Sequence, residues 1–280
     1  MSKIYDSRRC ELGEGPLWHP LRETLYWFDI EGHKLLSADA EWRFDEYVSA
    51  AGWVDQDHLI VASASQLFEF NLQTGNQRKL ADLEADNPIT RSNDGRADPQ
   101  GGFWIGTMGV NAEPGAGAIY RYYRGQLRQL FAPITISNSI CFAPDGGRAY
   151  FCDTPTRQIM AVALDDDGWP VGDPDVVIDL RDSGENPDGS VVDADGNIWN
   201  AQWGAYRVAC YAPDGQFLHS VAVPAAHASC PAFGGETGRM FVTTAMQGLS
   251  DMERAENPAH GQTFVVETDA TGQLEHQVIL

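Results

Sequence analysis

The most constraining feature of this sequence is a β-type repeat that recurs along the whole chain. In each repeat a short strand-like run leads through a turn into a second run of aromatic and aliphatic residues, as at 17–20 followed by 25–28. The second runs lie 34, 44, 46, 49 and 42 residues apart when they are marked by Tyr26, Ile60, Trp104, Tyr150, Trp199 and Phe241. Units of this length hold about four strands each, as in a propeller blade.

These repeats predict an all-β fold, a six-bladed β-propeller with four-stranded blades, in which residues 1–280 form a single domain. Ring closure would leave no free sheet edge. A β-solenoid and a large two-sheet sandwich are the alternatives, although a sandwich does not require six similar hairpins. Residues 3–6 and 276–280 are both candidates for the strand that completes the last blade. One short helix is predicted near Ser250 and Glu253, which have capping-box spacing.

Charge and cysteine content restrict the class of partner and the cellular setting. The chain has 40 acidic and 19 basic residues, a net charge of −21. Such a surface argues against binding to nucleic acid and disfavours an anionic membrane surface. The five cysteines show no Cys-x-x-Cys spacing, no apolar run is long enough for a membrane span, and the N-terminus lacks a signal-peptide core. We therefore expect a reducing, cytoplasmic setting.

Aligning the repeats on the turn after the first strand reveals a set of polar residues at one register. Six residues before that turn, four repeats carry an oxygen-bearing side chain: Glu14, Asn93, Asn138 and Asp188. The equivalent positions are about Ala50 in the second repeat and Ser229 or Cys230 in the sixth. Because the innermost strands of a propeller start together at its axis, we expect these side chains to converge.

Two carboxylates and two amides around one axis would repel each other or lack partners unless a cation joined them. Their oxygen atoms suit a divalent ion, with calcium favoured, magnesium and manganese also suitable, and zinc or iron(II) as further alternatives. The competing interpretation is that these residues only form turns at strand starts, since Asn and Asp are common turn residues.

Several motifs containing these residues resemble the regucalcin (senescence marker protein) and gluconolactonase family. They occur in order along essentially the whole chain, at 12–18 (LGEGPLW), 91–95 (RSNDG), 106–108 (GTM), 136–138 (ISN) and 187–189 (PDG). The resemblance implies a six-bladed propeller with one divalent metal ion on its axis. It also implies a hydrolase that opens a sugar (aldono-) lactone to the sugar acid in carbohydrate catabolism. Bacterial sugar-acid lactonases such as the xylonolactonase group look most alike.

The resemblance also assigns roles to individual residues. The metal ligands would be Glu14, Asn138 and Asp188. The residues that bind the substrate would be Arg91, Asn93 and Glu113. Asp188 is in addition the candidate catalytic base, which would take a proton from the attacking water.

One residue departs from the family pattern, and two aromatic residues are candidates for the pocket wall. Ser139 follows Asn138 where glycine is common, and we expect the serine to be tolerated provided that φ is negative there. Trp203 follows the fifth hairpin, and His227 precedes the sixth inner strand.

Two alternative functions are left open. One is another esterase or organophosphate hydrolase on the same scaffold, and the other is a non-catalytic calcium-binding propeller. Oligomeric state is left open.

Overall fold

The computed structural model describes residues 2–280 and consists mainly of antiparallel β-strands. Four separate sheets contain four strands each. The first consists of β2 (Gly13–His19), β3 (Thr24–Asp29), β4 (Lys34–Ser37) and β5 (Glu41–Arg43). The second consists of β6 (Val48–Trp53), β7 (His58–Ser63), β8 (Gln66–Asn71) and β9 (Gln77–Asp82). The third consists of β10 (Thr90–Ala97), β11 (Phe103–Gly109), β12 (Gly117–Tyr123) and β13 (Gln126–Ile134). The fourth consists of β14 (Ser137–Phe142), β15 (Arg148–Asp153), β16 (Gln158–Leu164) and β17 (Pro170–Asp179).

The rest of the described strands form an eight-stranded sheet with two four-stranded parts. One part consists of β18 (Asn186–Val192), β19 (Ile198–Trp203), β20 (Arg207–Tyr211) and β21 (Phe217–Ala222). The other consists of β22 (His227–Phe233), β23 (Arg239–Ala245), β24 (Thr263–Glu267) and the N-terminal strand β1 (Ser2–Asp6). The two parts are joined through one residue pair of β19 and β22, Trp203 with His227. The prediction of an all-β chain with four-stranded antiparallel units is therefore confirmed.

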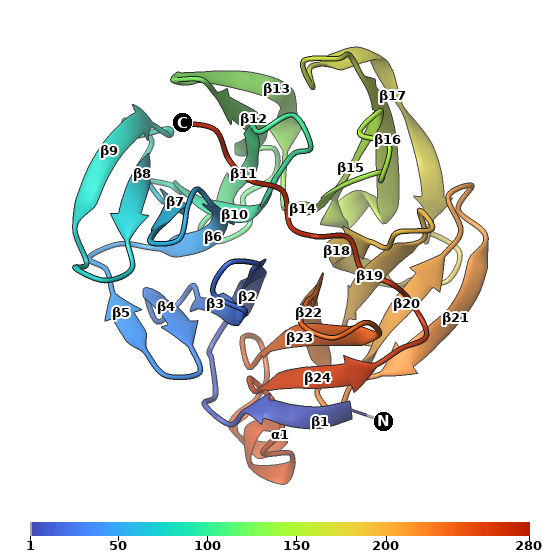
Figure 1. Cartoon of the computed structure of the whole chain (residues 1–280). Coiled ribbons are helices and arrows are strands. Elements are labelled where there is room, and N and C mark those ends of the chain that lie inside the picture. The colour runs from blue at the N-terminus through green and yellow to red at the C-terminus, as the bar shows by residue number, and fades with distance from the viewer. Residues whose placement is uncertain (1) are drawn as a thin grey trace.

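The sheets are arranged around a central axis, with the first strand of each unit nearest to that axis (Figure 1). Each of these strands contacts the first strand of the next unit, and β22 returns to contact β2. Neither a solenoid nor a two-sheet sandwich has this ring of contacts, so both alternatives are wrong.

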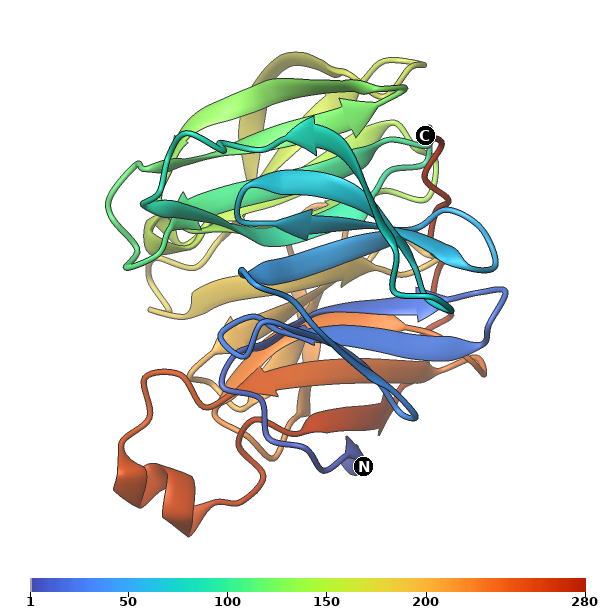
Figure 2. The ribbon, with the colours of Figure 1, turned by 90° about the vertical axis from the view of Figure 1, so that its left-hand side faces the viewer.

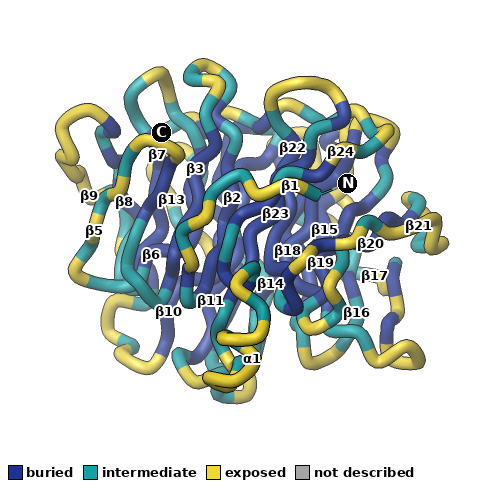
Figure 3. The backbone as a smooth tube through the Cα atoms, turned by 90° about the horizontal axis from the view of Figure 1, so that it is seen from below, coloured by how far each residue is buried: buried dark blue, intermediate teal, exposed yellow. Residues whose placement is uncertain are grey.

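The hydrophobic core lies between neighbouring sheets, where the aromatic second runs of the repeats are buried (Figure 3). All six residues that mark these runs are at most 3% exposed. Trp104 and Trp199 are among the largest fully buried side chains. Burial of one large apolar side chain contributes roughly 1.5–3 kcal/mol, so these repeated positions supply a large part of the driving force for packing the sheets together.

The N-terminal segment, and not the C-terminal one, completes the last four-stranded unit. Strand β1 pairs with β24, as expected for the first of the two candidate segments. The second candidate belongs to the C-terminal strap, residues 271–280, which crosses the end of the ring on the opposite face from α1 (Asp251–Glu256) (Figures 1 and 2). The Val278 amide donates to the Trp53 carbonyl, and the Ile279 amide donates to the Gly101 carbonyl. The strap therefore links several sheets and adds no strand to the last one.

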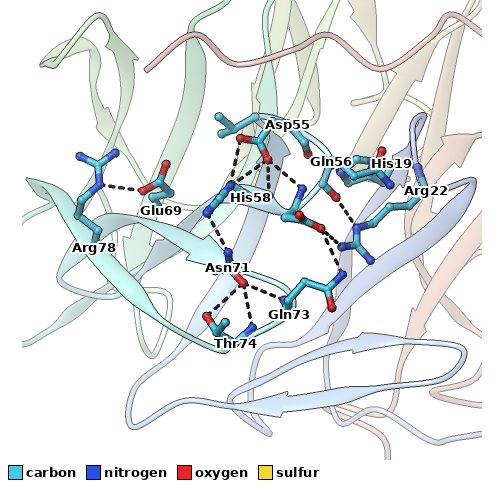
Figure 4. Close-up of polar contacts among 12 residues, drawn as sticks. His19, Arg22, Asp55, Gln56, His58, Glu69, Asn71, Gln73, Thr74 and Arg78 are labelled. Carbon is cyan, nitrogen blue, oxygen red and sulfur yellow. Dashed lines mark hydrogen bonds and ion pairs between the residues drawn. The ribbon is translucent and has the colours of Figure 1, made fainter.

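The turns at the strap end of the ring are held by polar contacts between the first and second sheets (Figure 4). Arg22, after β2, pairs with Asp57 at 2.5 Å and donates to the carbonyl of Gln56. Asp55 accepts hydrogen bonds from the backbone and the ring of His58. These contacts fix the end of β2, whose other end carries the predicted ligand Glu14.

Helix α1 has the predicted capping box. The Ser250 side chain accepts a hydrogen bond from the Glu253 amide, and the Glu253 side chain accepts one from the Ser250 amide. The helix stands out from the face opposite the strap (Figure 2). In residues 2–280 no helix combines the length and apolar character needed to cross a membrane.

Candidate active site

A cavity of about 680 Å³ opens at the axis on the face that carries α1. Its wall comes from the starts of the innermost strands and from the loops around them. It is lined by Leu12, Glu14, Arg91, Asn93, Met108, Val110, Asn111, Ala112, Ile136, Asn138, Thr154, Pro155, Asn186, Asp188, Trp203 and Gln247. All four residues of the shared register line this one cavity.

A repeated irregularity in the innermost strands explains why these side chains converge. In each of β2, β6, β10, β14, β18 and β22, pairing with the second strand of the unit shifts register as at a β-bulge. The shift falls at or directly after the predicted residue, and such a bulge redirects a side chain. In β6 it falls at Ser49, one residue before the position expected in the second repeat. In β22 it includes both Ser229 and Cys230.

Glycine allows the close approach of strands at this level. Gly15, directly after Glu14, has φ +52°, and an added Cβ would lie 2.2 Å from the Ser49 carbonyl oxygen. Any larger residue would force β2 and β6 apart, which would displace the Glu14 carboxylate.

Two buried carboxyl groups, those of Glu14 and Asp188, line the same cavity. Glu14 and Asp188 are each 5% exposed. Burial, followed by repulsion from Asp94, raises the pKa of Glu14 to about 8. Burial, followed by repulsion from Glu14 and Asp94, raises the pKa of Asp188 well above its ordinary value. Asp94 is a third buried carboxylate that the register analysis did not select, and its side chain accepts a hydrogen bond from the Ile140 amide at 2.7 Å.

The Asn138 amide is held in one orientation. Its Nδ2 donates to Thr154 Oγ1 at 2.9 Å, and that hydroxyl donates to the Pro187 carbonyl at 2.8 Å. Its Oδ1 accepts from Asn93 Nδ2 at 3.1 Å. A carbonyl oxygen has two lone pairs, so Asn138 Oδ1 keeps one for a further partner.

Arg91 and Asn93 form the cationic side of the cavity. Arg91 Nη1 donates to Asn93 Oδ1 at 2.8 Å and to the Ser92 carbonyl at 2.9 Å. Arg91 is buried, which lowers its pKa. Its Nε is buried and has no hydrogen-bond partner among residues 2–280.

Glu113 is not among the residues that line the cavity. It follows β11 and accepts hydrogen bonds from the Asn111 amide and from Asn111 Nδ2, both at 3.0 Å. Asn111 itself lines the cavity, so Glu113 contacts a cavity residue through this hydrogen bond. The structure thus places Glu113 beside the site without bringing it into the ligand cluster, and its substrate-binding role stays a prediction.

Of the two aromatic candidates, Trp203 lines the cavity, and His227 packs against the Trp203 ring. Their rings stack with centroids 4.1 Å apart and an interplanar angle of 14°. His227 itself does not line the cavity.

Sequence reasoning missed Thr154 and Gln247, which both line the cavity. The position of Thr154 could have been inferred from strand pairing. Asn138 pairs with Cys152, and a residue two positions further along a strand points to the same face of the sheet. Gln247 lies in the segment between β23 and α1 and donates to Glu31 at 3.0 Å. No spacing in the sequence connects this residue to Glu31, because the contact joins the two ends of the ring.

The condition stated for tolerance of Ser139, a negative φ, is not met, because its backbone has φ +60°. A non-glycine residue rarely adopts this region. The serine side chain is fully buried and forms hydrogen bonds that glycine could not form.

These observations fit a divalent cation held by Glu14, Asn138 and Asp188. The set offers oxygen atoms only, as calcium, magnesium and manganese prefer. A cation would also offset two buried carboxylates whose pKa values are raised by burial and by neighbouring negative charge. In residues 2–280 no cluster of three or more His, Cys, Asp and Glu side chains has metal-binding geometry, so the set depends on the Asn138 amide.

The chain is similar to known proteins in both sequence and structure. The model of the SMP-30/gluconolactonase/LRE-like region matches residues 12–246. L-arabinolactonase from Azospirillum brasilense is 40% identical over 94% of this chain and 91% of its own length. 6-Deoxy-6-sulfogluconolactonase from Pseudomonas putida is 32% identical over 94% of each chain. The crystal structure of the calcium-binding protein regucalcin from Agrobacterium tumefaciens is 40% identical, with a TM-score of 0.97 over 100% of this chain and 98% of that chain.

Proposed function

Because the chain belongs to the SMP-30/gluconolactonase/LRE-like family, we propose that it hydrolyses a sugar lactone to the sugar acid with one divalent cation on the axis. The chain is a sugar lactonase, as its similarity to named lactonases over 94% of its length indicates. The observation that supports a cation-dependent reaction is that Glu14, Asn138 and Asp188 line one cavity.

The proposal includes the architecture that creates this cavity. The eight-stranded sheet counts as two blades, since its halves are joined through one residue pair only. With the four separate sheets, this makes a six-bladed propeller formed by one domain. The closed ring of contacts among the innermost strands supports this count.

Glu14, Asn138 and Asp188 would hold the cation. When bound, a divalent cation polarises the lactone carbonyl and stabilises the negative charge that develops on its oxygen. Calcium is the favoured ion, which the all-oxygen set supports, and magnesium, manganese, zinc and iron(II) are the alternatives.

The remaining chemistry belongs to the side chains of this chain. In the reaction, water adds to the lactone carbonyl carbon, the ring C–O bond breaks, and the ring oxygen leaves as a hydroxyl. Asp188 would take the proton from the attacking water and return it to the departing ring oxygen. Arg91, which lines the cavity, would donate a hydrogen bond to a substrate oxygen. Asn93, which lines the cavity and forms hydrogen bonds with Arg91 and Asn138, would also bind the substrate. Glu113, which accepts hydrogen bonds from Asn111, is the third proposed substrate-binding residue.

The expected substrate is a small sugar lactone, and the setting is the cytoplasm. The cavity combines polar atoms for sugar hydroxyls with an apolar wall that includes Trp203 and Met108. The five cysteines are buried and free, which supports a reducing compartment.

The proposal is tested by following acid release with a pH indicator for a panel of aldono-lactones, pentose and hexose members included. Enzyme stripped with a chelator is compared with enzyme restored with one metal at a time. We expect rapid hydrolysis of a subset of the panel, loss with chelator, and recovery with one ion. Asp188→Asn is expected to lower kcat by about 10²–10⁴-fold.

Two results would contradict the proposal in different ways. Full activity of the Asp188→Asn enzyme with metal bound would remove Asp188 as the base. Rates no higher than spontaneous hydrolysis for every lactone and metal would favour another esterase or a non-catalytic calcium-binding role.

A further inference from the structure

Ser139 combines an unfavourable backbone conformation with a place beside the ligand cluster. It follows Asn138 directly, is fully buried, and has φ +60°. The register shift in β14 lies between Asn138 and Cys141, so Ser139 is part of the irregularity that directs Asn138 towards the axis. Backbone strain of this kind persists only where surrounding contacts hold it.

The Ser139 hydroxyl provides such contacts. It donates to the main-chain carbonyl of Asp188 at 2.5 Å. It accepts from Ser190 Oγ at 3.0 Å and from Asn200 Nδ2 at 3.3 Å. Asn200 Nδ2 also donates to the Asp188 carbonyl at 3.0 Å. The backbone of Asp188 is thus held by two donors, one of them on the strand that carries Asn138.

We propose that Ser139 is a positioning residue that fixes the spacing between Asn138 on β14 and Asp188 on β18. Its left-handed backbone directs the first of these residues to the axis, and its hydroxyl holds the main chain of the second. This inference rests on the axial cation of the proposed function. Partners that orient ligands typically change metal affinity by about 10–100-fold when they are removed.

Two other serines show why the position of Ser139 matters. Ser49 Oγ donates to Ser92 Oγ at 2.8 Å, which joins β6 to β10. Ser229 Oγ donates to the Gly13 carbonyl, which joins β22 to β2. Hydroxyl contacts across neighbouring inner strands are therefore a shared feature of the ring. Of these three serines, Ser139 lies next to one proposed ligand and contacts the main chain of another.

Three variants separate the hydroxyl from the backbone. Ser139→Ala removes the hydroxyl and keeps a Cβ at positive φ. Ser139→Gly removes the hydroxyl and allows positive φ without strain. Ser49→Ala removes a cross-strand hydroxyl that lies within the register shift of β6, a strand without a proposed ligand. Each full-length protein is stripped with a chelator and titrated with Ca²⁺ and with Mn²⁺ by calorimetry, and its melting temperature is measured without metal.

We expect both Ser139 variants to bind the preferred ion about 10–100-fold more weakly than the wild type, with a nearly unchanged affinity for Ser49→Ala. The stripped Ser139→Gly protein is expected to melt above Ser139→Ala, because glycine relieves the strain. If wild-type protein binds the ion and both Ser139 variants bind it equally well, the positioning role is wrong. If wild-type protein binds neither ion at the axis, the cation of the proposed function fails instead.

Discussion

Single hydroxyl groups determine which atom of an amide faces the cavity. Asn138 can serve a cation only through Oδ1, and Thr154 accepts a hydrogen bond from its Nδ2. Since the Thr154 hydroxyl is itself committed as a donor to the Pro187 carbonyl, it can only accept from Asn138. Because Thr154 can only accept, the Nδ2 of Asn138 must face Thr154, and its Oδ1 therefore faces Asn93 and the axis.

Thr154→Val is therefore expected to weaken metal binding by about 10–100-fold, because the isosteric side chain cannot accept from Asn138 Nδ2. Thr154→Ser retains the hydroxyl and is the matched control, with an affinity close to that of the wild type. Calorimetric titration of the stripped proteins measures both. Equal affinities for the valine and serine variants would show that the Asn138 orientation has another source.

At the scale of elements, the same bulge in successive inner strands produces the site. A regular strand alternates its side chains between two faces, and the bulge breaks that alternation at one level of the ring. The far ends of these strands are held by turn contacts and by the C-terminal strap.

The strap carries a buried ion pair. Glu275 on the strap pairs with Arg96 on β10, and their side chains are 6% and 10% exposed. Gln273 Nε2 donates to the Val192 carbonyl at 2.9 Å, so the strap also holds β18. This segment thus connects two strands that carry residues of the site.

Glu275→Ala is expected to lower the free energy of unfolding by about 3–5 kcal/mol, because it leaves the Arg96 charge buried without a partner. Replacing both residues, as Arg96→Met with Glu275→Leu, is expected to restore much of this loss. Urea unfolding measures both changes.

The control is Glu236→Ala, at an exposed ion pair with Arg239, with an expected change within about 1 kcal/mol. A similarly small change for Glu275→Ala would mean that water or another group compensates Arg96 when the strap pair is broken.

At the scale of the whole molecule, ring closure couples the charge of the site to folding. The carboxylates of Glu14 and Asp188 come from strands far apart in the sequence and share an environment only in the folded protein. In the stripped protein, burial raises the pKa of Glu14 from 4.5 to about 8. Between these two values the folded state keeps a proton that the unfolded state has lost.

Stability of the stripped protein is therefore expected to fall as pH rises from about 4.5 to 8. A cation replaces the proton, so the increase in melting temperature on adding metal is expected to be larger at pH 8 than at pH 5.5. Each kcal/mol of unfolding free energy that depends on protonation of the site corresponds to a shift in melting temperature of roughly 2–4 °C. Thermal melts with and without metal at both pH values test this, with Glu14→Gln as the control that reduces the difference. A metal effect that is independent of pH would contradict it.

Much of this architecture was predictable because its causes are local and repeated. Buried aromatic or aliphatic residues recur in the second strand of each unit, and turn residues mark where the first strand ends. A polar residue at a constant distance from that turn could therefore be assigned to the axis from repeat spacing alone. The capping box of α1 is equally local, since both partners lie within one helical turn.

The remaining features depend on contacts between segments that are distant in the chain. Both termini had strand-like sequences, and only the folded ring determines that β1, and not the C-terminal segment, pairs with β24. The positive φ of Ser139 and the separation of Glu113 from the cavity follow from neighbours on other strands and from loop geometry, which repeat spacing does not specify. Periodicity thus determined which residues face the axis. Tertiary packing decided how their atoms are oriented and charged there, because burial and cross-strand hydrogen bonds exist only once the ring is closed.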